Sequence, residues 1–151
     1  MNIWFVVPGE PRGKARPKVT RTKSGNSLTY TPDKTVAYEE LVRLRFTNAA
    51  PEGFCFEAGT PLYMIVTAYM GIPKSKSKRQ KADIIANILR PTKKPDFDNV
   101  FKILCDALNG IAYADDAQIV DASIRKRYSE SPRVEVEIGE IKDLQHHAAD
   151  L

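Results

Sequence analysis

Two pairs of aspartates, one on each side of a helical pattern, supply the residue types that can do chemistry in this chain. Asp96 and Asp98 flank Phe97 at the start of the pattern, and Asp115 and Asp116 follow its end. One carboxylate at a helix start is ordinary, because it caps free backbone N–H groups and suits the positive end of the helix dipole. Two exceed what a cap requires. We therefore expect this first pair and one of the later two aspartates to form a compact acidic cluster.

Carboxylates gathered in this way repel one another, and in proteins a bound cation usually neutralises this repulsion. Ligation by oxygen alone, without His or Cys, favours Mg²⁺ or Mn²⁺ over zinc. Lys102 follows Asp98 by four residues and therefore lies on the same helical face, where Asp106 continues the polar stripe. A metal ion at such a cluster activates water for phosphodiester hydrolysis, and Lys102 can neutralise the phosphate or the leaving oxygen.

The helix that must position these residues has a regular apolar stripe. Gly110 supplies its C-terminal stop, and Pro95 directs the chain into its first turn. We expect Phe97 to anchor this turn in the core, with both neighbouring carboxylates pointing outward. The predicted core positions recur at helical spacing: Val100, Phe101, Leu104, Ala107, Leu108 and Ile111.

Hydrophobic periodicity places further elements around this helix. Thr31 is a plausible N-cap for a helix that continues to about Asn48, with Pro32 in its first turn, and a basic helix is predicted over 75–87. Strands are predicted over 2–7, 62–70, 117–127 and 133–141, of which 62–70 reads as a central strand buried on both faces.

This element order predicts an α/β or α+β fold in which a mixed β-sheet packs with helices. We expect residues 1–151 to form a single small nuclease-type domain. Residues 9–31 are predicted to be a basic loop or mobile hairpin that becomes ordered on a ligand, and 143–151 a frayed tail.

Basic side chains are concentrated in two stretches, residues 1–48 and 74–102, whereas the segment from residue 105 onward is acidic. Concentrated positive charge suits a polyanion with regularly spaced phosphates, although solvated surface segments would have the same composition. The residues predicted to contact such a nucleic acid are Lys14, Arg16, Lys18, Lys74, Lys76, Lys78, Arg79, Lys93 and Lys94.

Composition excludes several other classes of protein. An apolar fraction of 42% and a charged fraction of 28% are typical of globular domains. The apolar stretches are too short or too broken to cross a bilayer, and residues 1–10 lack the pattern of a secretory signal, so we expect a cytoplasmic protein. Cys55 and Cys105 are isolated and are predicted to be reduced and partly buried.

Taken together, these motifs match one family. Asp96-Phe-Asp-Asn99, Lys102, Asp106-Ala-Leu108, Gly110 and Asp115-Asp-Ala-Gln118 closely resemble the signature of RusA-type Holliday junction resolvases. The segments Pro8-Gly-Glu-Pro11 and Lys14-Ala-Arg-Pro17 are similar to those of RusA-like proteins of phage and prophage origin, and differ from the Pro-Pro-Ser-x-Asn start of other members.

The resemblance implies an endonuclease that resolves four-way DNA junctions by paired symmetric cuts in recombination and repair. It implies that Asp96, Asp98 and Asp116 ligate Mg²⁺, for which Mn²⁺ can substitute, with Asp115 beside them and Lys102 assisting catalysis. Members of the family act as homodimers, as two symmetric cuts across a junction require.

Two other interpretations of the residues stay open at this point. Pro95-Asp96 with Glu140-Ile-Lys142 matches the short PD-(D/E)xK nuclease pattern, which would leave Asp98 and Lys102 without roles. In a non-catalytic branched-DNA-binding protein, the aspartates would be helix caps and turn residues, and binding would need no metal.

Overall fold

In the computed structural model of the chain, residues 1–144 are described, so the predicted tail lies outside the described residues from position 145 onward. The named elements of residues 1–144 are two β-sheets, three α-helices and one short 3₁₀ helix, and residues 141–144 are also helical. In order, the elements are β1 (Asn2–Pro8), β2 (Lys18–Arg21), β3 (Ser27–Tyr30), α1 (Asp33–Ala49), β4 (Leu62–Gly71), α2 (Lys78–Ile85), α3 (Phe97–Leu108), η1 (Asp116–Gln118), β5 (Ile119–Ser129) and β6 (Arg133–Glu140).

The main sheet is mixed, with the strand order β1-β6-β4-β5. β4 pairs in parallel with β5 and antiparallel with β6, and β6 pairs antiparallel with β1. β5 and β6 follow each other in the chain, yet β4 lies between them. β4 is therefore central, as predicted, but the prediction that both its faces are buried is wrong: Ile65, Thr67 and Tyr69 are only partly buried.

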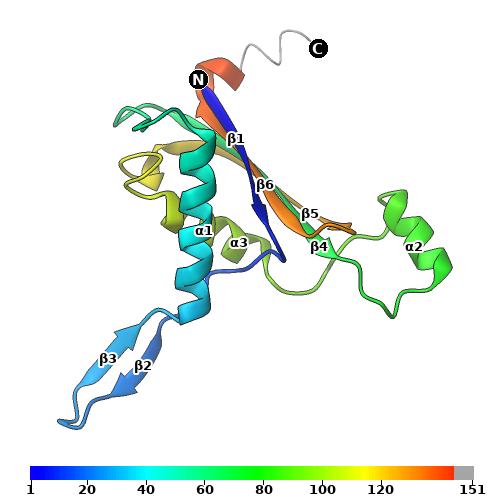
Figure 1. Cartoon of the computed structure of the whole chain (residues 1–151), viewed down its shortest axis with the longest axis horizontal. Helices are drawn as coiled ribbons and strands as arrows, with labels where there is room; N and C mark the ends of the chain where they lie inside the picture. Colours follow the sequence, from blue (N-terminus) through cyan, green and yellow to red (C-terminus); the bar gives the residue numbers. More distant parts are fainter. Residues whose placement is uncertain (145–151) are drawn as a thin grey trace.

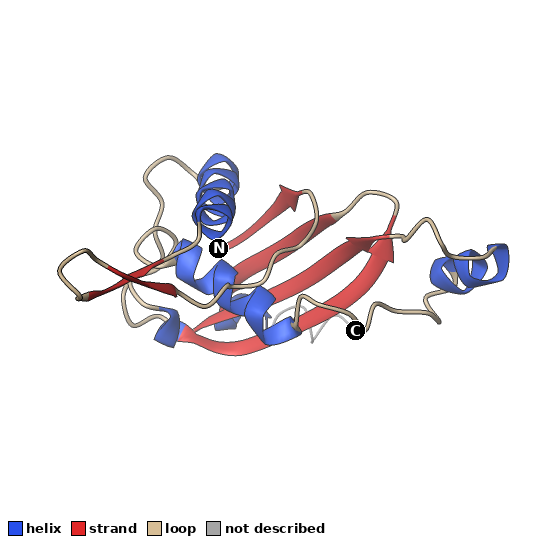
Figure 2. Cartoon of the chain, turned by 90° about the horizontal axis from the view of Figure 1, so that it is seen from below, coloured by secondary structure: helices blue, strands red, loops and turns tan. Residues whose placement is uncertain are grey.

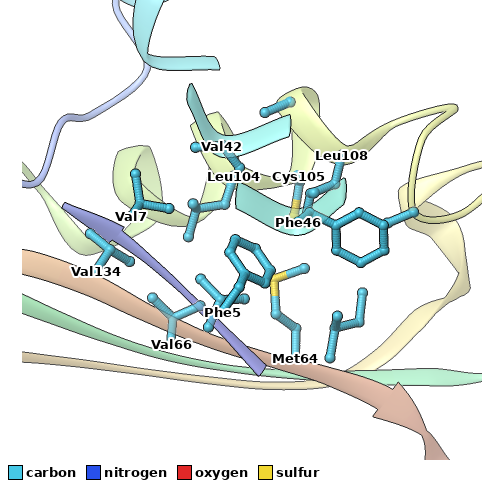
Figure 3. Close-up of a cluster of buried hydrophobic side chains, with 14 of the residues drawn as sticks. Phe5, Val7, Val42, Phe46, Met64, Val66, Leu104, Cys105, Leu108 and Val134 are labelled. Atoms are coloured by element: carbon cyan, nitrogen blue, oxygen red, sulfur yellow. The ribbon is translucent and has the colours of Figure 1, made fainter. Parts of the chain in front are cut away.

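Helices α1 and α3 cover one face of this sheet (Figure 2). Between the helices and the sheet lies the hydrophobic core, in which Phe5 of β1 meets the ring of Phe46 of α1 edge to face at 5.8 Å. Figure 3 shows this cluster with Leu104 and Leu108 of α3 above Met64 of β4. The single mixed sheet with its helices confirms the predicted fold class.

Helix α1 begins one residue later than predicted. Its N-cap position is occupied by Pro32 instead of Thr31, and no side chain within residues 1–144 caps this end by a hydrogen bond. The buried positions Thr35, Tyr38, Val42 and Phe46 follow helical spacing. The helix therefore packs one narrow stripe of side chains against the core.

The first part of the predicted basic loop, residues 9–17, is a docked segment that we call the strap. The backbone N–H of Gly9 donates to the carbonyl of Pro132 at 3.0 Å, and the carboxylate of Glu10 accepts from the N–H of Gly71 at 3.0 Å. These contacts fix the strap to the ends of β6 and β4 without any ligand.

Farther along, the strap crosses the first turn of α3. The N–H of Lys14 donates to the carbonyl of Asn99 at 2.8 Å. A Cβ at Gly13 would lie 3.0 Å from the Cβ of Asn99 and 3.1 Å from that of Pro95. Glycine at this position therefore allows the strap to approach the helix closely.

The second part of the basic loop is a β-hairpin that extends from the body of the protein, below the start of α1 in Figure 1. Strands β2 and β3 pair antiparallel, and every residue of both strands is exposed. Helix α2 extends at the opposite end of the molecule (Figures 1 and 2). It is the basic helix that the sequence predicts, although only Ile84 among its residues is buried.

Both cysteines within the described part of the chain are free thiols, as predicted. Cys105 is buried in the core and Cys55 is exposed, so the expectation of partial burial is wrong for both. None of the helices in residues 1–144 is long and apolar enough to cross a membrane.

Candidate active site

The first turn of α3 presents its aspartates to solvent. Asp96 occupies the N-cap position, but no hydrogen bond within the described residues joins its carboxylate to the helix end. Asp96 and Asp98 are both exposed, and one oxygen of Asp98 accepts a hydrogen bond from the backbone N–H of Asn99 in the first turn at 2.9 Å. Phe97 does not anchor this turn in the core, as the sequence suggested, because 61% of its surface is exposed. It lies about one turn before Val100, the first buried position of the apolar stripe.

One side of α3 borders a hollow of about 510 Å³ that we call the acidic hollow. Asp98 and Lys102 reach it from α3, and Asp116 reaches it from the start of η1. The apolar part of its wall comes from the rings of Phe97 and Phe101 and from β5. The structure thus brings together three of the predicted site residues from two segments separated in the sequence.

A dense set of hydrogen bonds fixes the turn that holds Asp115 and Asp116. The side-chain oxygen of Gln118 accepts from the N–H groups of Ala114 and Asp115, and its amide nitrogen donates to the carbonyl of Glu57 at 2.9 Å. Gln118 is buried, which makes these contacts difficult to replace with water.

A second contact ties this turn to the end of α3. The side-chain oxygen of Asn109 accepts from the N–H of Asp116 at 3.1 Å. The carboxylate of Asp115 accepts from the N–H of Ala117 at 3.0 Å. Consequently Asp115 forms the N-terminal cap of η1, whereas Asp116 lines the acidic hollow.

Negative charge accumulates around Asp116. Partial burial raises the pKa of Asp116, and its hydrogen bond with Asp115 and the negative charges of Asp115 and Asp106 raise it further, against the opposing effect of Lys102. The hydrogen bond from Ala117 lowers the pKa of the exposed Asp115, with a further contribution from Asp116. A divalent cation beside Asp116 would relieve this repulsion.

The donor set of the acidic hollow fits Mg²⁺ only in part. Asp98 and Asp116 supply carboxylate oxygens, and Mg²⁺ is commonly held by one or two carboxylates together with water and phosphate oxygens. No group of three His, Cys, Asp or Glu side chains within residues 1–144 is arranged to hold a metal ion. The structure does not bring Asp96 into this pair, so a three-aspartate ligand set stays a prediction.

Asp96 instead faces a second, basic hollow on the other side of the same helical turn. This hollow, of about 820 Å³, lies between the strap, the start of α1 and the residues that precede α3. Six basic residues surround the single carboxylate in its lining: Arg12, Lys14, Arg16, Lys18, Lys34 and Lys94. Positive charge concentrated beside an acidic hollow suits a nucleic-acid backbone.

The other predicted DNA contacts lie elsewhere. Lys74 lines a hollow between α2 and the turn after β5, and Lys76, Lys78 and Arg79 belong to α2 or the loop before it. Lys93 is exposed, and its carbonyl accepts a hydrogen bond from Lys126 at 2.6 Å. The sequence predicts DNA binding for all of these basic residues together, but in the structure most of them lie in two groups, one at the basic hollow and one around α2.

Lys14 differs from the other basic residues in having two carboxylate partners. Its ammonium nitrogen lies 2.5 Å from an oxygen of Glu39 on α1 and 3.1 Å from Oδ2 of Asp106 on α3. The same Oδ2 lies 3.6 Å from the ammonium nitrogen of Lys102. Asp106 therefore links the strap to the acidic hollow.

The alternative PD-(D/E)xK frame is not assembled. Glu140 pairs with Lys142 at 2.7 Å and lies opposite Leu62 at the start of β4. Lys93, close to Asp96 in the chain, contacts Lys126, which lies opposite Ala68. Glu140 is absent from the lining of both hollows that border α3, so it does not share a hollow with Asp96.

The fold and the site together define a class of protein, a small α+β domain with carboxylates and a lysine beside a basic hollow, as in nucleases that hydrolyse phosphodiesters. Comparison with known families agrees: the family model "Endodeoxyribonuclease RusA" matches residues 8–139. The chain belongs to this family of endonucleases.

Two relatives extend this comparison. The chain is 40% identical over 141 residues to "Uncharacterized protein YqaN" of Bacillus subtilis (strain 168), covering 92% of this chain and 96% of that protein. It is 35% identical over 88 residues to "Crossover junction endodeoxyribonuclease rusA" of Lactococcus phage r1t, covering 58% of this chain and 60% of the phage protein.

Several residues with a structural part in the site were not identified from the sequence as such. Gln118 has a detectable signal, since an aspartate followed by Gln three residues later is a capping-box pattern. Asn109 and Glu39 have none, because their partners are brought close only by the fold.

Proposed function

We propose that this member of the endonuclease family is a Mg²⁺-dependent resolvase that cuts four-way DNA junctions by paired symmetric strand cleavage. The observation that carries the proposal is the position of Asp98, Lys102 and Asp116 in one hollow, with the basic hollow on the other side of the same helix. The name of the phage relative, a crossover junction endodeoxyribonuclease, supports four-way junctions as the substrate.

In this proposal Asp98 and Asp116 hold the metal ion, for which Mn²⁺ can substitute. The metal, when bound, supplies an activated water and stabilises the charge that develops on the phosphoryl group. Asp115 holds the turn that presents Asp116, since its own carboxylate caps η1. Asp96 lines the basic hollow, and in this proposal its carboxylate joins the metal or contacts a strand when DNA binds.

The remaining residues position the substrate and stabilise charge. Lys102 projects into the acidic hollow with 62% of its side chain exposed, where its ammonium group can neutralise the phosphate or the leaving oxygen. Arg16, Lys18 and Lys94 bind the DNA backbone beside the site, and the basic side chains of α2 bind a more distant segment.

A homodimer is part of the proposal. Residues 1–144 of one chain form the acidic hollow described above, and two symmetric cuts need two such sites related by a two-fold axis. Four-way junctions present that symmetry, so a dimer can engage both target strands at once.

Cleavage of a synthetic four-way junction with a fixed centre tests the proposal, with a linear duplex of the same sequence as the matched substrate. We expect paired symmetric cuts in the junction with Mg²⁺, no cuts with EDTA, and none from Asp98→Asn, whose junction affinity should stay within about twofold.

Each alternative predicts a different result. Tight, salt-sensitive junction binding without cuts at any metal concentration would support the non-catalytic DNA-binding protein. Equal cleavage of the linear duplex would leave a nuclease but refute junction specificity. Loss of cleavage in Glu140→Gln with full activity in Asp116→Asn would support the PD-(D/E)xK frame.

A further inference from the structure

We infer that Asp106, held by Lys14 of the strap, is a positioning residue that fixes the ammonium group of Lys102 at the acidic hollow. The inference rests on the proposed function, because it concerns how that site is organised. It assigns Lys14 to the support of the site and not to the binding of DNA phosphates.

The argument begins with one oxygen atom shared between two cations. Oδ2 of Asp106 lies 3.1 Å from the ammonium nitrogen of Lys14 and 3.6 Å from that of Lys102. Asp106 is partly buried on α3, four residues after Lys102 and thus one turn farther along the same face. Its carboxylate is the fixed partner in this pair, since Lys102 is largely exposed.

Lys14 in turn is fixed from two directions. Its backbone N–H donates to the carbonyl of Asn99, and its ammonium group pairs with Glu39 as well as Asp106. The exposed fractions of the Lys14 and Glu39 side chains are only 18% and 13%. Glu39 has a second, longer contact with Arg43 on its own helix, at 3.9 Å. A series of contacts thus runs from α1 through the strap to Asp106 on α3.

Lys102 gains a defined position from this arrangement. A free lysine side chain loses up to about 2 kcal/mol of rotamer entropy when it is immobilised. Because Lys14 already fixes the carboxylate of Asp106, pairing with Asp106 restricts the Lys102 side chain before the substrate binds. Less rotamer entropy is then lost when the substrate binds. Sharing one oxygen with Lys14 also weakens the hold on Lys102, which leaves that ammonium group available to a phosphate oxygen.

The same contacts argue against Lys14 as a DNA contact. Two carboxylates lie within 3.1 Å of its ammonium group, and their negative charges reduce its electrostatic attraction to a phosphate. Lys18, from the same stretch of sequence, is exposed on β2 and lines the same basic hollow. These two lysines form a matched pair for an experiment.

A double-mutant cycle under single-turnover conditions, with saturating enzyme and Mg²⁺, tests the coupling. Asp106→Asn should lower the cleavage rate about tenfold while the junction Kd stays within twofold. In a Lys102→Ala background, Asp106→Asn should change the rate by less than about twofold, because its effect passes through Lys102. Glu52→Gln, the same change of carboxylate to amide on an exposed connector, is the control and should have no effect. Independent losses that multiply in the double variant would overturn the inference.

The two lysines give the second arm. Lys14→Met should lower the single-turnover rate severalfold without changing the Kd or its salt dependence, and Lys14→Arg should restore most of the rate. Lys18→Met should weaken binding and reduce the slope of log K against log salt by about 0.9. The same reduction in Lys14→Met would overturn the inference, since it would identify Lys14 as a residue that binds phosphate.

A readout that needs no cleavage separates this inference from the proposed function. In NMR spectra of the lysine side chains, Asp106→Asn should shift the signals of both Lys14 and Lys102 and leave that of Lys23 unchanged. An unchanged Lys102 signal would refute the inference even if the junction is cut. An inactive wild type with both signals shifted would refute the proposed function alone.

Discussion

At the residue scale, Asp115 and Asp116 are adjacent in the chain, yet their pKa values shift in opposite directions. The exposed Asp115 accepts a hydrogen bond from Ala117, which favours its charged form. The carboxyl group of Asp116 is partly buried among other carboxylates, which disfavours its charge. The two residues therefore have different roles: Asp115 maintains the turn, and Asp116 provides the negative charge that a cation would neutralise.

Lys14 gives a prediction about stability and pH. Partial burial lowers its pKa, but the hydrogen bonds and charges of Glu39 and Asp106 outweigh that effect and raise the pKa above 10.5. A pKa raised in the folded state adds stability that is fully present below pH 10.5 and is lost as the pH rises through the folded value. Lys14→Met should therefore lower the free energy of unfolding by about 1–3 kcal/mol at pH 8, and by less at pH 11. Urea unfolding at both pH values measures this difference.

Lys23→Met is the control for that experiment, because Lys23 is exposed at the tip of the hairpin and should show no difference at either pH. A destabilisation of Lys14→Met of equal size at pH 8 and pH 11 would mean that the aliphatic part of the side chain, and not its charge, stabilises the strap.

The acids of the site could be found from sequence because their spacing in the chain is itself the signal. The surroundings of Lys14 could not, since Glu39 and Asp106 come from separate helices. Phe97 was misplaced for a related reason: periodicity shows on which side of a helix a residue lies, but not how far along the helix the neighbouring elements cover it.

At the element scale, the β2–β3 hairpin has no part in the core. Its strands are exposed on both faces, and a two-stranded hairpin by itself is marginally stable in water. Its side chains include Lys18 and Arg21, with Lys23 in the turn. Such a ribbon suits binding to a DNA groove or backbone.

Replacing residues 19–29 with a short Gly-Ser linker should therefore leave the unfolding temperature within about 2 °C and weaken junction binding. The salt slope should fall by about 0.9 for every phosphate that the hairpin neutralises in the wild type. Titrations at several salt concentrations measure both the affinity and the slope. Unaltered affinity would show that the hairpin does not bind DNA. A large drop in thermal stability would show that the hairpin has a structural role.

Helix α2 depends on its own cap to an unusual degree. Ser77 and Gln80 form a reciprocal capping box, with donor–acceptor distances of 2.9 and 3.2 Å. Tertiary support is slight, because Ile84 is its one buried side chain among the described residues and Ile85 is 85% exposed. Most helices in proteins rely on packing of an apolar face.

Ser77→Ala should therefore destabilise α2 locally by about 1 kcal/mol, whereas global unfolding should change little. Hydrogen exchange resolved to short peptides should show roughly fivefold faster exchange in residues 78–85, with unchanged exchange in α3. Ser75→Ala, two residues earlier and outside the capping box, is the matched control. An equal drop in global stability would mean that α2 is integral to the folding unit.

At the scale of the whole molecule, the strands and helices were largely predictable but their arrangement was not. Alternation indicated β5 and β6 as two strands but did not predict their order in the sheet, where β4 lies between them. That order is determined by pairing of β4 with segments more than fifty residues away. The same long-range packing brings the acidic and basic hollows to opposite sides of one helical turn.

The proposed two-fold assembly leads to the last prediction. A homodimer should have a mass of about 34 kDa in solution, twice the 16.9 kDa of the chain. A plasmid with an extruded cruciform is made linear only if both strands are cut within one complex, and a single cut leaves a nicked circle. Wild-type dimers should give linear product, whereas purified mixed dimers with one Asp98→Asn subunit should give nicked circles. Linear product from mixed dimers, or a 17 kDa species that makes both cuts, would refute paired action by two sites, because one acidic hollow would then suffice for both strands.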